Sequence, residues 1–262
     1  MKNGLKLYFN YISVLLRSTM QYKTSFFLSL AGQVLLTFNE IIAVYFLFAR
    51  FNNIKGFTFS EIMLCFSIVL MSFSVAESYA RGFDSFSNFI VTGDFDRLLL
   101  RPRSLILQVL GSKFEFARVG RLIQGIVMLG YGVAFSNITW NALKIFTLAF
   151  MLLGGVAVFT GLFLVYAALC FFTVEGLEFV NIFTDGARTF GAYPVSIYGK
   201  KILKVCTFII PYSLFQYYPL LYLFGKTQKS AIPFFPLLAF LFLIPCYALW
   251  RYGVKKYKST GS

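Results

Sequence analysis

The chain has 262 residues and a formal net charge of +14, yet only 13% of its residues are charged, 58% are hydrophobic and its mean hydropathy is +0.74. Soluble domains carry about 25% charged residues, so this composition excludes a soluble globular protein and predicts an integral membrane protein. The four cysteines lie in apolar runs without a CxxC pair and the sequence has no histidine, which argues against disulfides and metal ligation.

The first segment, 1–23, is expected to be an amphipathic helix in the membrane interface. Its basic residues are spread along the segment rather than placed ahead of one apolar core, which excludes a cleavable signal peptide. Its apolar residues recur near helical spacing, at Leu5, Tyr8, Phe9, Ile12 and Leu16. The alternative interpretation is that the segment forms the frayed start of the first membrane span.

Six membrane spans are expected in chain order. Since about 20 apolar residues cross a bilayer, the long apolar runs predict spans at 25–49, 59–79 and 143–172. The third span is expected to extend from 105 to 135 and to protrude into water through turns that carry Lys113, Glu115, Arg118 and Arg121. The fifth span, 202–224, is expected to break near Pro211, and the sixth covers 232–250.

The orientation of these spans follows from their basic residues. Six spans place both termini on one side, where nineteen lysines and arginines fall, against five on the other, so the positive-inside rule makes both termini cytoplasmic. A re-entrant segment at 212–230 is expected between spans five and six, because irregular backbone at membrane depth must be buried in protein. The net charge is explained by topology and by anionic lipid headgroups, without a nucleic-acid partner.

The sequence offers no catalytic constellation and no nucleotide site. It has no histidine for general base work and no serine or cysteine nucleophile with a partner. The "GKT" at 225–227 resembles the end of a phosphate-binding loop, but that motif requires glycine at position 220, where the chain has Leu220. We therefore expect no enzyme activity, cofactor or metal on this chain.

Acidic residues within the expected spans are functional candidates, because charges are rare in hydrocarbon. Glu40 in span one is expected to line a polar route, to pair with a partner chain, or to reach toward the outer headgroups. Glu77 is expected to pair with Arg81, four residues later. Tyr212 and Gln216, in the polar cluster of the fifth run, complete the set of possible pathway residues.

The loop 81–104 contains the charged stretch "GDFDRLLLRPRS". A turn signal at Gly93 and a stop at Arg101 before Pro102 predict a short helix on the cytosolic face. Three leucines and charges of both signs suit the docking of a soluble partner. The alternative is that these charges only anchor an inner loop.

The stretches "GDFDRLLLRP", "GAYPVSIYGKKI", "IIPYSLFQYYPLLYLFG" and "YKSTGS" resemble the membrane subunits of ATP-binding-cassette (ABC) exporters, specifically the type-2 permease family. The likeness covers the whole chain in span count and order. It implies one permease domain over 1–262 in a bacterial plasma membrane, paired with a second permease chain, identical or homologous. It also implies an ABC ATPase dimer as partner, on which ATP and magnesium are bound.

In that family the loop between spans two and three couples to the ATPase. The resemblance therefore implies a set of coupling residues in 81–104, namely Asp94, Asp96, Arg97, Leu99, Arg101, Pro102 and Arg103. It implies export of an amphipathic, peptide, drug or lipid-like substrate. The alternative is a self-contained secondary transporter or channel that uses Glu40 and Glu77, although sparse intramembrane acids and the lack of a visible internal repeat argue against it.

Overall fold

The computed structural model describes residues 2–51, 53–173, 178–227 and 229–259, and these ranges are helical without a strand. The α-helices are α1 (Lys2–Gln21), α2 (Lys23–Arg50), α3 (Phe59–Asp84), α4 (Phe86–Val91), α5 (Asp94–Leu99), α6 (Leu105–Ser112), α7 (Arg118–Phe135), α8 (Ala142–Leu169), α9 (Asp185–Phe190), α10 (Lys200–Phe208), α11 (Tyr212–Phe215), α12 (Tyr217–Leu223), α13 (Phe235–Ala239) and α14 (Leu243–Lys256). Short 3₁₀ turns are η1 (Glu178–Ile182), η2 (Val195–Tyr198), η3 (Ile232–Phe234) and η4 (Phe240–Phe242).

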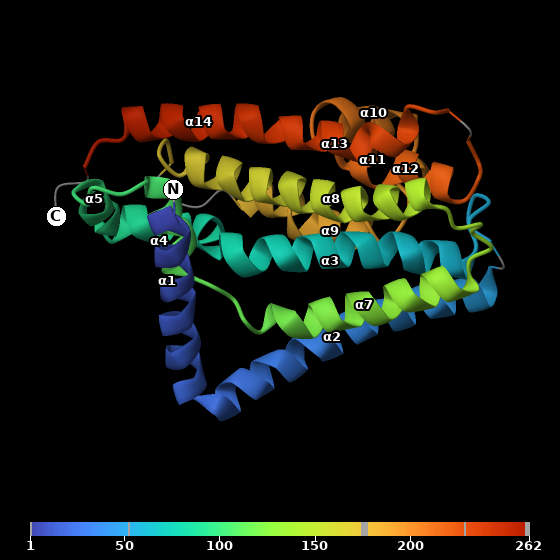
Figure 1. Cartoon of the computed structure of the whole chain (residues 1–262), viewed down its shortest axis with the longest axis horizontal. Helices are drawn as coiled ribbons and strands as arrows, with labels where there is room; N and C mark the ends of the chain where they lie inside the picture. The colour runs from blue at the N-terminus through green and yellow to red at the C-terminus, as the bar shows by residue number, and fades with distance from the viewer. Residues whose placement is uncertain (1, 52, 174–177, 228, 260–262) are drawn as a thin grey trace.

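The long helices α2, α3, α7, α8 and α14 form an elongated bundle, and both ends of the chain lie at the same end of it (Figure 1). Within the described residues, four helical stretches are long and apolar enough to cross a membrane: α2, 59–91, α8 and 232–256. They correspond to the expected spans one, two, four and six. The terminal residues 260–262, part of the "YKSTGS" stretch, lie outside the described residues.

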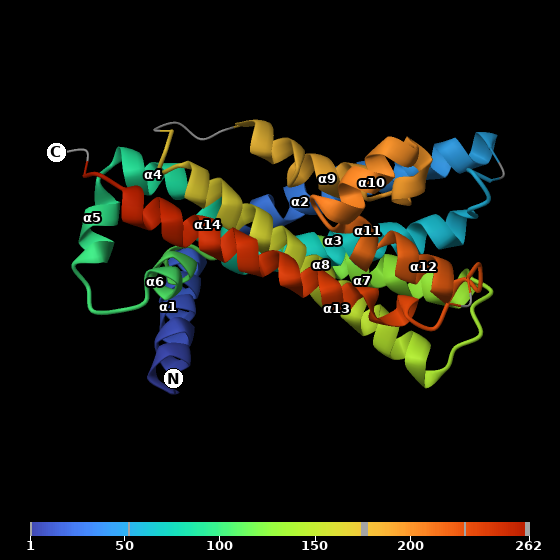
Figure 2. The ribbon, with the colours of Figure 1, turned by 90° about the horizontal axis from the view of Figure 1, so that it is seen from above.

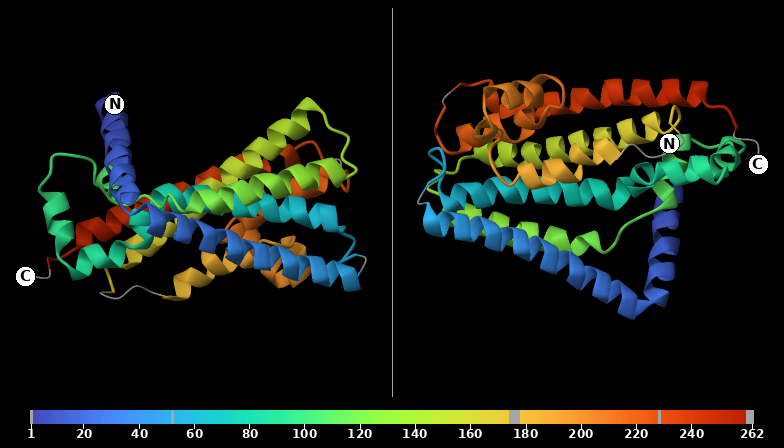
Figure 3. Two further views of the ribbon diagram at one scale, coloured as in Figure 1. Left: turned by 90° about the horizontal axis from the view of Figure 1, so that it is seen from below. Right: turned by 180° about the vertical axis from the view of Figure 1, so that it is seen from behind.

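Helix α1 stands across the bundle axis at the end that holds the termini (Figures 1 and 3). The backbone leaves helical geometry at Tyr22, where ψ is 64°, so α1 is a separate helix rather than the start of α2. It packs on α6, where Tyr11 lies so close to Gly111 that a Cβ there would be 2.5 Å from its ring. Phe9 and Val14 of α1 are exposed, although both are apolar.

Helix α3 is the centre of the bundle, and nearly all its side chains between Ile62 and Phe83 are buried. A capping box starts it, in which the Thr58 and Glu61 side chains each bond to the other residue's backbone N–H. Helices α7 and α8 pack on its two sides (Figure 1). At Gly132 of α7 a Cβ atom would lie 2.7 Å from Leu64 Cβ, so this close contact requires glycine, as is common between membrane helices.

The expected continuous third helix from 105 to 135 is not formed. Helix α6 ends at Ser112, Lys113 is extended, and α7 begins at Arg118. Glu115 pairs with Arg81 and Lys113. Arg118 and Arg121 do not project into water either, because both turn toward an acid on α3 that is described below.

The expected fifth span, 202–224, is divided into α10, α11 and α12, with a break at Pro211. Before this stretch, the Ile197 carbonyl accepts a hydrogen bond from Lys55 Nζ at 3.0 Å. After it, Lys226 Nζ donates to the Gly56 carbonyl at 2.9 Å. Lys55 and Gly56 belong to the loop that joins α2 to α3. Both ends of 197–226 therefore lie at one end of the bundle, opposite the termini (Figure 2).

The chain therefore passes from the end with the termini to the opposite end through η1, α9 and η2, before α10 begins (Figure 2). The sequence had placed this passage in 202–224. Lys200, Lys201 and Lys204 lie at the end opposite the termini, whereas the sequence count assigned them to the cytoplasmic side. The stretch 178–198 was not recognised because Asp185, Arg188 and Pro194 interrupt its apolar residues. The excess of basic residues at the end with both termini is smaller than counted but keeps its sign.

The close contact of α7 with α3 gives a test of the fold. Gly132→Val places methyl groups against Leu64, and overpacking of this kind costs about 1–3 kcal/mol, so the midpoint of thermal unfolding in detergent should fall. Gly130→Val is the matched control, because it makes the same substitution on the same helix with nothing within 4 Å of the new Cβ. Equal midpoints for the two variants would contradict this packing.

Candidate functional site

The charged loop forms the short helix α5, as expected. Gly93 precedes it with φ +71°, a left-handed conformation that suits glycine. Asp94 opens the helix and is held from both sides, since Thr92 Oγ1 donates to its Oδ2 at 2.8 Å and Arg97 Nη1 donates to its Oδ1 at 3.1 Å. A carboxylate in the first turn also interacts favourably with the helix dipole.

The end of α5 and the loop after it present an exposed surface that combines leucines with arginines. Its members are Leu99, Leu100, Arg101, Pro102 and Arg103, and Leu100 is 86% exposed. Gln108 of α6 fixes the backbone beneath them, because its Nε2 donates to the carbonyls of Leu98 at 3.1 Å and Arg103 at 3.2 Å. Arg97 is also exposed, while Asp96 accepts from Ser259 Oγ at 2.6 Å. The predicted coupling residues therefore share one end of the molecule.

A cluster of aromatic rings joins α5 to the bundle. Phe95 is fully buried, with ring centroids 5.3 Å from Phe86, 5.1 Å from Phe171 and 4.9 Å from Tyr257. Trp250 of α14 lies 5.0 Å from Phe86 and 5.2 Å from Phe171. This aromatic cluster connects α4, α5, the residues after α8, and α14. The sequence analysis missed it, because its members are far apart in the chain.

Glu77 lies at the centre of a buried charge cluster. Its carboxylate accepts from Arg81 at 3.3 Å, which confirms the expected pairing, and also from Arg118 at 2.8 Å and Arg121 at 3.0 Å. Arg121 donates a further bond to Gln33 of α2. Breaking a buried ion pair is strongly destabilising, so these contacts hold α2, α3 and α7 together. The two α7 arginines were expected in water.

Glu40 is paired within its own chain. Arg188 Nη1 of α9 lies 2.7 Å from Glu40 Oε2, so this carboxylate is bound by an arginine of the same chain. The guanidinium groups of Arg188 and Arg121 lie 5.9 Å and 5.8 Å from the ring centroid of Phe73. Through this shared ring the Glu40 pair adjoins the Glu77 cluster.

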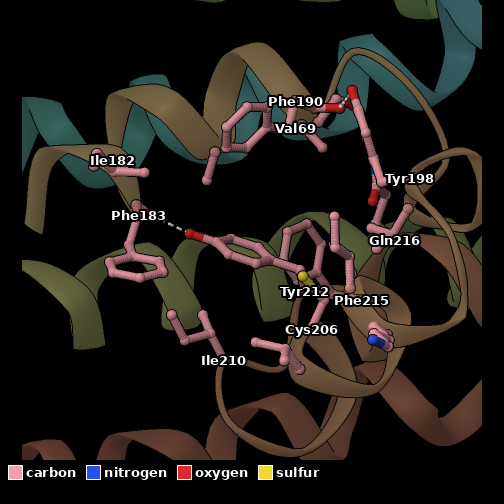
Figure 4. A pocket seen from close by; sticks show the side chains of 16 residues that line it. Val69, Ile182, Phe183, Phe190, Tyr198, Cys206, Ile210, Tyr212, Phe215 and Gln216 are labelled. Carbon is pink, nitrogen blue, oxygen red and sulfur yellow. Dashed lines mark hydrogen bonds between the residues drawn. The ribbon is translucent and has the colours of Figure 1, made fainter.

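Tyr212 and Gln216 lie elsewhere, in the wall of a cavity of about 340 Å³ between α9 and α10–α11 (Figure 4). Tyr212 Oη donates to the Phe183 carbonyl. Gln216 Nε2 donates to the carbonyls of Gly191 at 2.8 Å and Tyr193 at 3.1 Å. Both residues thus fix the 183–193 backbone against α11, and the four predicted pathway residues do not form one polar route.

Long apolar helices packed around a buried charge cluster, with a charged loop held at one end, define a multi-pass membrane protein. A family model described as "ABC-2 family transporter protein" matches residues 34–261. The chain belongs to this family, the type-2 permeases of ABC transporters. Comparison with curated proteins and with solved structures gives no match.

The charge cluster gives a second prediction. Glu77→Gln removes the shared carboxylate from three arginines, and leaving buried charge uncompensated costs about 3–5 kcal/mol, so we expect a large fall in the unfolding midpoint in detergent. Arg121→Gln should cost less, because Glu77 keeps two arginines. The double variant should be more stable than the sum of the two single effects implies. Strict additivity of the two single effects, or an unchanged midpoint for Glu77→Gln, would show that the charge cluster does not stabilise the folded protein.

Proposed function

We propose that this chain is the permease subunit of an ATP-driven exporter, working with a separate ATPase dimer and a second permease chain. Family membership supports the general assignment. The observation that carries the finer proposal is α5, whose exposed leucines and arginines adjoin a fully buried Phe95. An exposed apolar and cationic surface that is firmly attached to the membrane helices suits docking and force transfer together.

The aromatic cluster supplies a route for this transfer. Packed interiors transmit displacement rather than absorb it, so a push on α5 moves Phe95 against Phe86, Phe171 and Tyr257. These rings belong to segments continuous with α3, α8 and α14, and the last two pack against each other. ATP and magnesium act on the partner subunit, and this chain converts closure of the ATPase pair into helix movement.

The proposed topology has six crossings, formed by α2, α3, α7, α8, the irregular stretch 178–198, and 232–256. In this topology 200–224 is a re-entrant segment on the outer side, which is supported by the contacts of its flanking residues Ile197 and Lys226 with the α2–α3 loop. Both termini are cytoplasmic, α1 lies in the inner interface, and the membrane is a bacterial plasma membrane. The remaining excess of basic residues at the terminal end supports this orientation.

The alternative, a secondary transporter or channel that uses Glu40 and Glu77, is less well supported. A carboxylate that handles ions has to be free to exchange a proton or cation during the cycle. Glu40 is bound to Arg188 and Glu77 to three arginines, so releasing either would leave arginines unpaired among helices. These contacts favour a structural role for both acids.

The docking surface gives the test of this proposal. Arg101→Glu reverses one exposed charge without touching the aromatic cluster, so the chain should insert normally but lose its soluble partner. We expect recovery of an ATPase with an intact phosphate-binding loop to fall about tenfold when the tagged chain is purified in mild detergent and its partners are identified by mass spectrometry.

Lys229→Glu is the control, because it reverses an exposed charge at the opposite end of the bundle. It should retain the partner fully. Purification of the wild-type chain without an ATPase, together with ion-driven flux in liposomes that needs no ATP, would refute the proposal in favour of the secondary transporter.

A further inference from the structure

The cavity between α9 and α10–α11 is lined almost entirely by hydrocarbon. Its inner wall is buried and includes Val69 and Phe215 (Figure 4). Its outer edge is open to the surroundings of the protein, because Ile182 and Phe190 are 55% and 51% exposed. A volume of about 340 Å³ falls within the range of small-molecule pockets, which is about 300–1,000 Å³.

The polar donors in this wall are already occupied. Tyr212 Oη donates to the Phe183 carbonyl, and Tyr198 Oη donates to the Phe190 carbonyl at 2.9 Å, as Figure 4 shows. The Gln216 amide donates to the Gly191 and Tyr193 carbonyls. Apart from Lys201 at its edge, the lining offers a polar ligand no side-chain O–H or amide donor that is not already bonded, whereas a hydrocarbon chain would break no hydrogen bond by entering.

One edge of the cavity is cationic. Lys201 is the charged residue in its lining. Lys204 lies three positions after Lys201 and four positions after Lys200, and these two spacings make side chains neighbours on a helix surface. All three side chains are exposed, and none has an ion-pair partner in the part of the chain that the structure describes. On the adjacent side of α10, Ile202, Val205 and Cys206 line the cavity.

We propose that this cavity binds one hydrocarbon chain of an anionic amphiphile, whose headgroup lies on Lys200, Lys201 and Lys204. The hydrocarbon chain of the ligand occupies the space between α9 and α11, and the lysines at the rim favour a negatively charged headgroup. Except for Val69 of α3, the lining comes from the segment 182–216, and its lysine edge lies toward the end of the bundle opposite the termini. This inference concerns binding alone and does not depend on ATP-driven transport.

The test uses photoactivatable lipids with the purified full-length protein in phosphatidylcholine nanodiscs, without ATP or partner subunits. Three probes carry the same diazirine-labelled chain: phosphatidylglycerol, a free fatty acid and phosphatidylcholine. Mass spectrometry after irradiation maps the labelled residues. We expect both anionic probes to label 182–190 and 202–216 more strongly than phosphatidylcholine, and the stronger of the two identifies the headgroup source.

Two variants separate the rim from the cavity. Lys201→Glu with Lys204→Glu should reduce anionic labelling of these peptides about tenfold or more, because two charges that attract an anionic headgroup become two that repel it. Lys255→Glu at the other end is the charge control. Val205→Trp fills the cavity and should also reduce labelling, whereas Ile209→Trp, exposed and outside the lining, should not.

The proposal is overturned if phosphatidylcholine labels the cavity as strongly as the anionic probes, if Lys201 and Lys204 reversal has no effect, or if labelling is spread evenly over exposed α2 residues. Because no ATPase is present, any of these results leaves the exporter proposal intact. Likewise, unchanged ATPase recovery in the Arg101→Glu variant would count against the exporter proposal and leave this lipid site unaffected.

Discussion

The arrangement of the bundle depends on the burial of one carboxylate, that of Glu77. An ion taken from water into a helical bundle costs several kcal/mol unless charged partners surround it. Arg81, Arg118 and Arg121 supply those partners, and Arg121 reaches on to Gln33 of α2. This requirement explains why a helix expected to rise into water as one piece is divided, so that α7 begins where its first turn faces α3. Once α7 is held there, its glycines allow its backbone to approach that of α3 closely.

Much of this architecture could be predicted from local pattern. Uninterrupted apolar runs located α2, α3, α8 and the last span, Pro211 located a break, and Gly93 with Pro102 bounded the short helix α5. The passage through α9 could not be found in this way. Its polar groups are compensated by residues far away in the sequence, Arg188 by Glu40 and the Gly191 carbonyl by Gln216. The aromatic cluster was missed for the same reason, since no local period links Phe95, Phe171 and Trp250.

Helix α5 is too short to keep its shape alone, because isolated helices of this length are marginal in water. Its stability comes from contacts at both faces: Phe95 inserts among rings of the bundle, and Gln108 bonds the backbone on either side of the exposed leucines. The end of the chain adds a further contact through Tyr257 and Ser259. The predicted docking residues are therefore presented by a rigid support, and a displacement of α5 requires the surrounding helices to move with it.

The Arg188–Glu40 pair also bears on how the protein is made. An arginine or aspartate at the centre of a membrane helix costs about 2.5–3.5 kcal/mol during insertion by the translocon. In the proposed topology, the stretch 178–198 is a poor autonomous insertion signal, because Asp185 and Arg188 lie three residues apart within it and the three lysines that follow have to reach the outer side. Helix α2 is synthesised before this stretch, so Glu40 is already present as a counter-ion for Arg188. Integration of the fifth crossing is thus a late step in biogenesis that depends on α2. It requires α2 to remain close to the point of insertion, so that Glu40 can pair with Arg188.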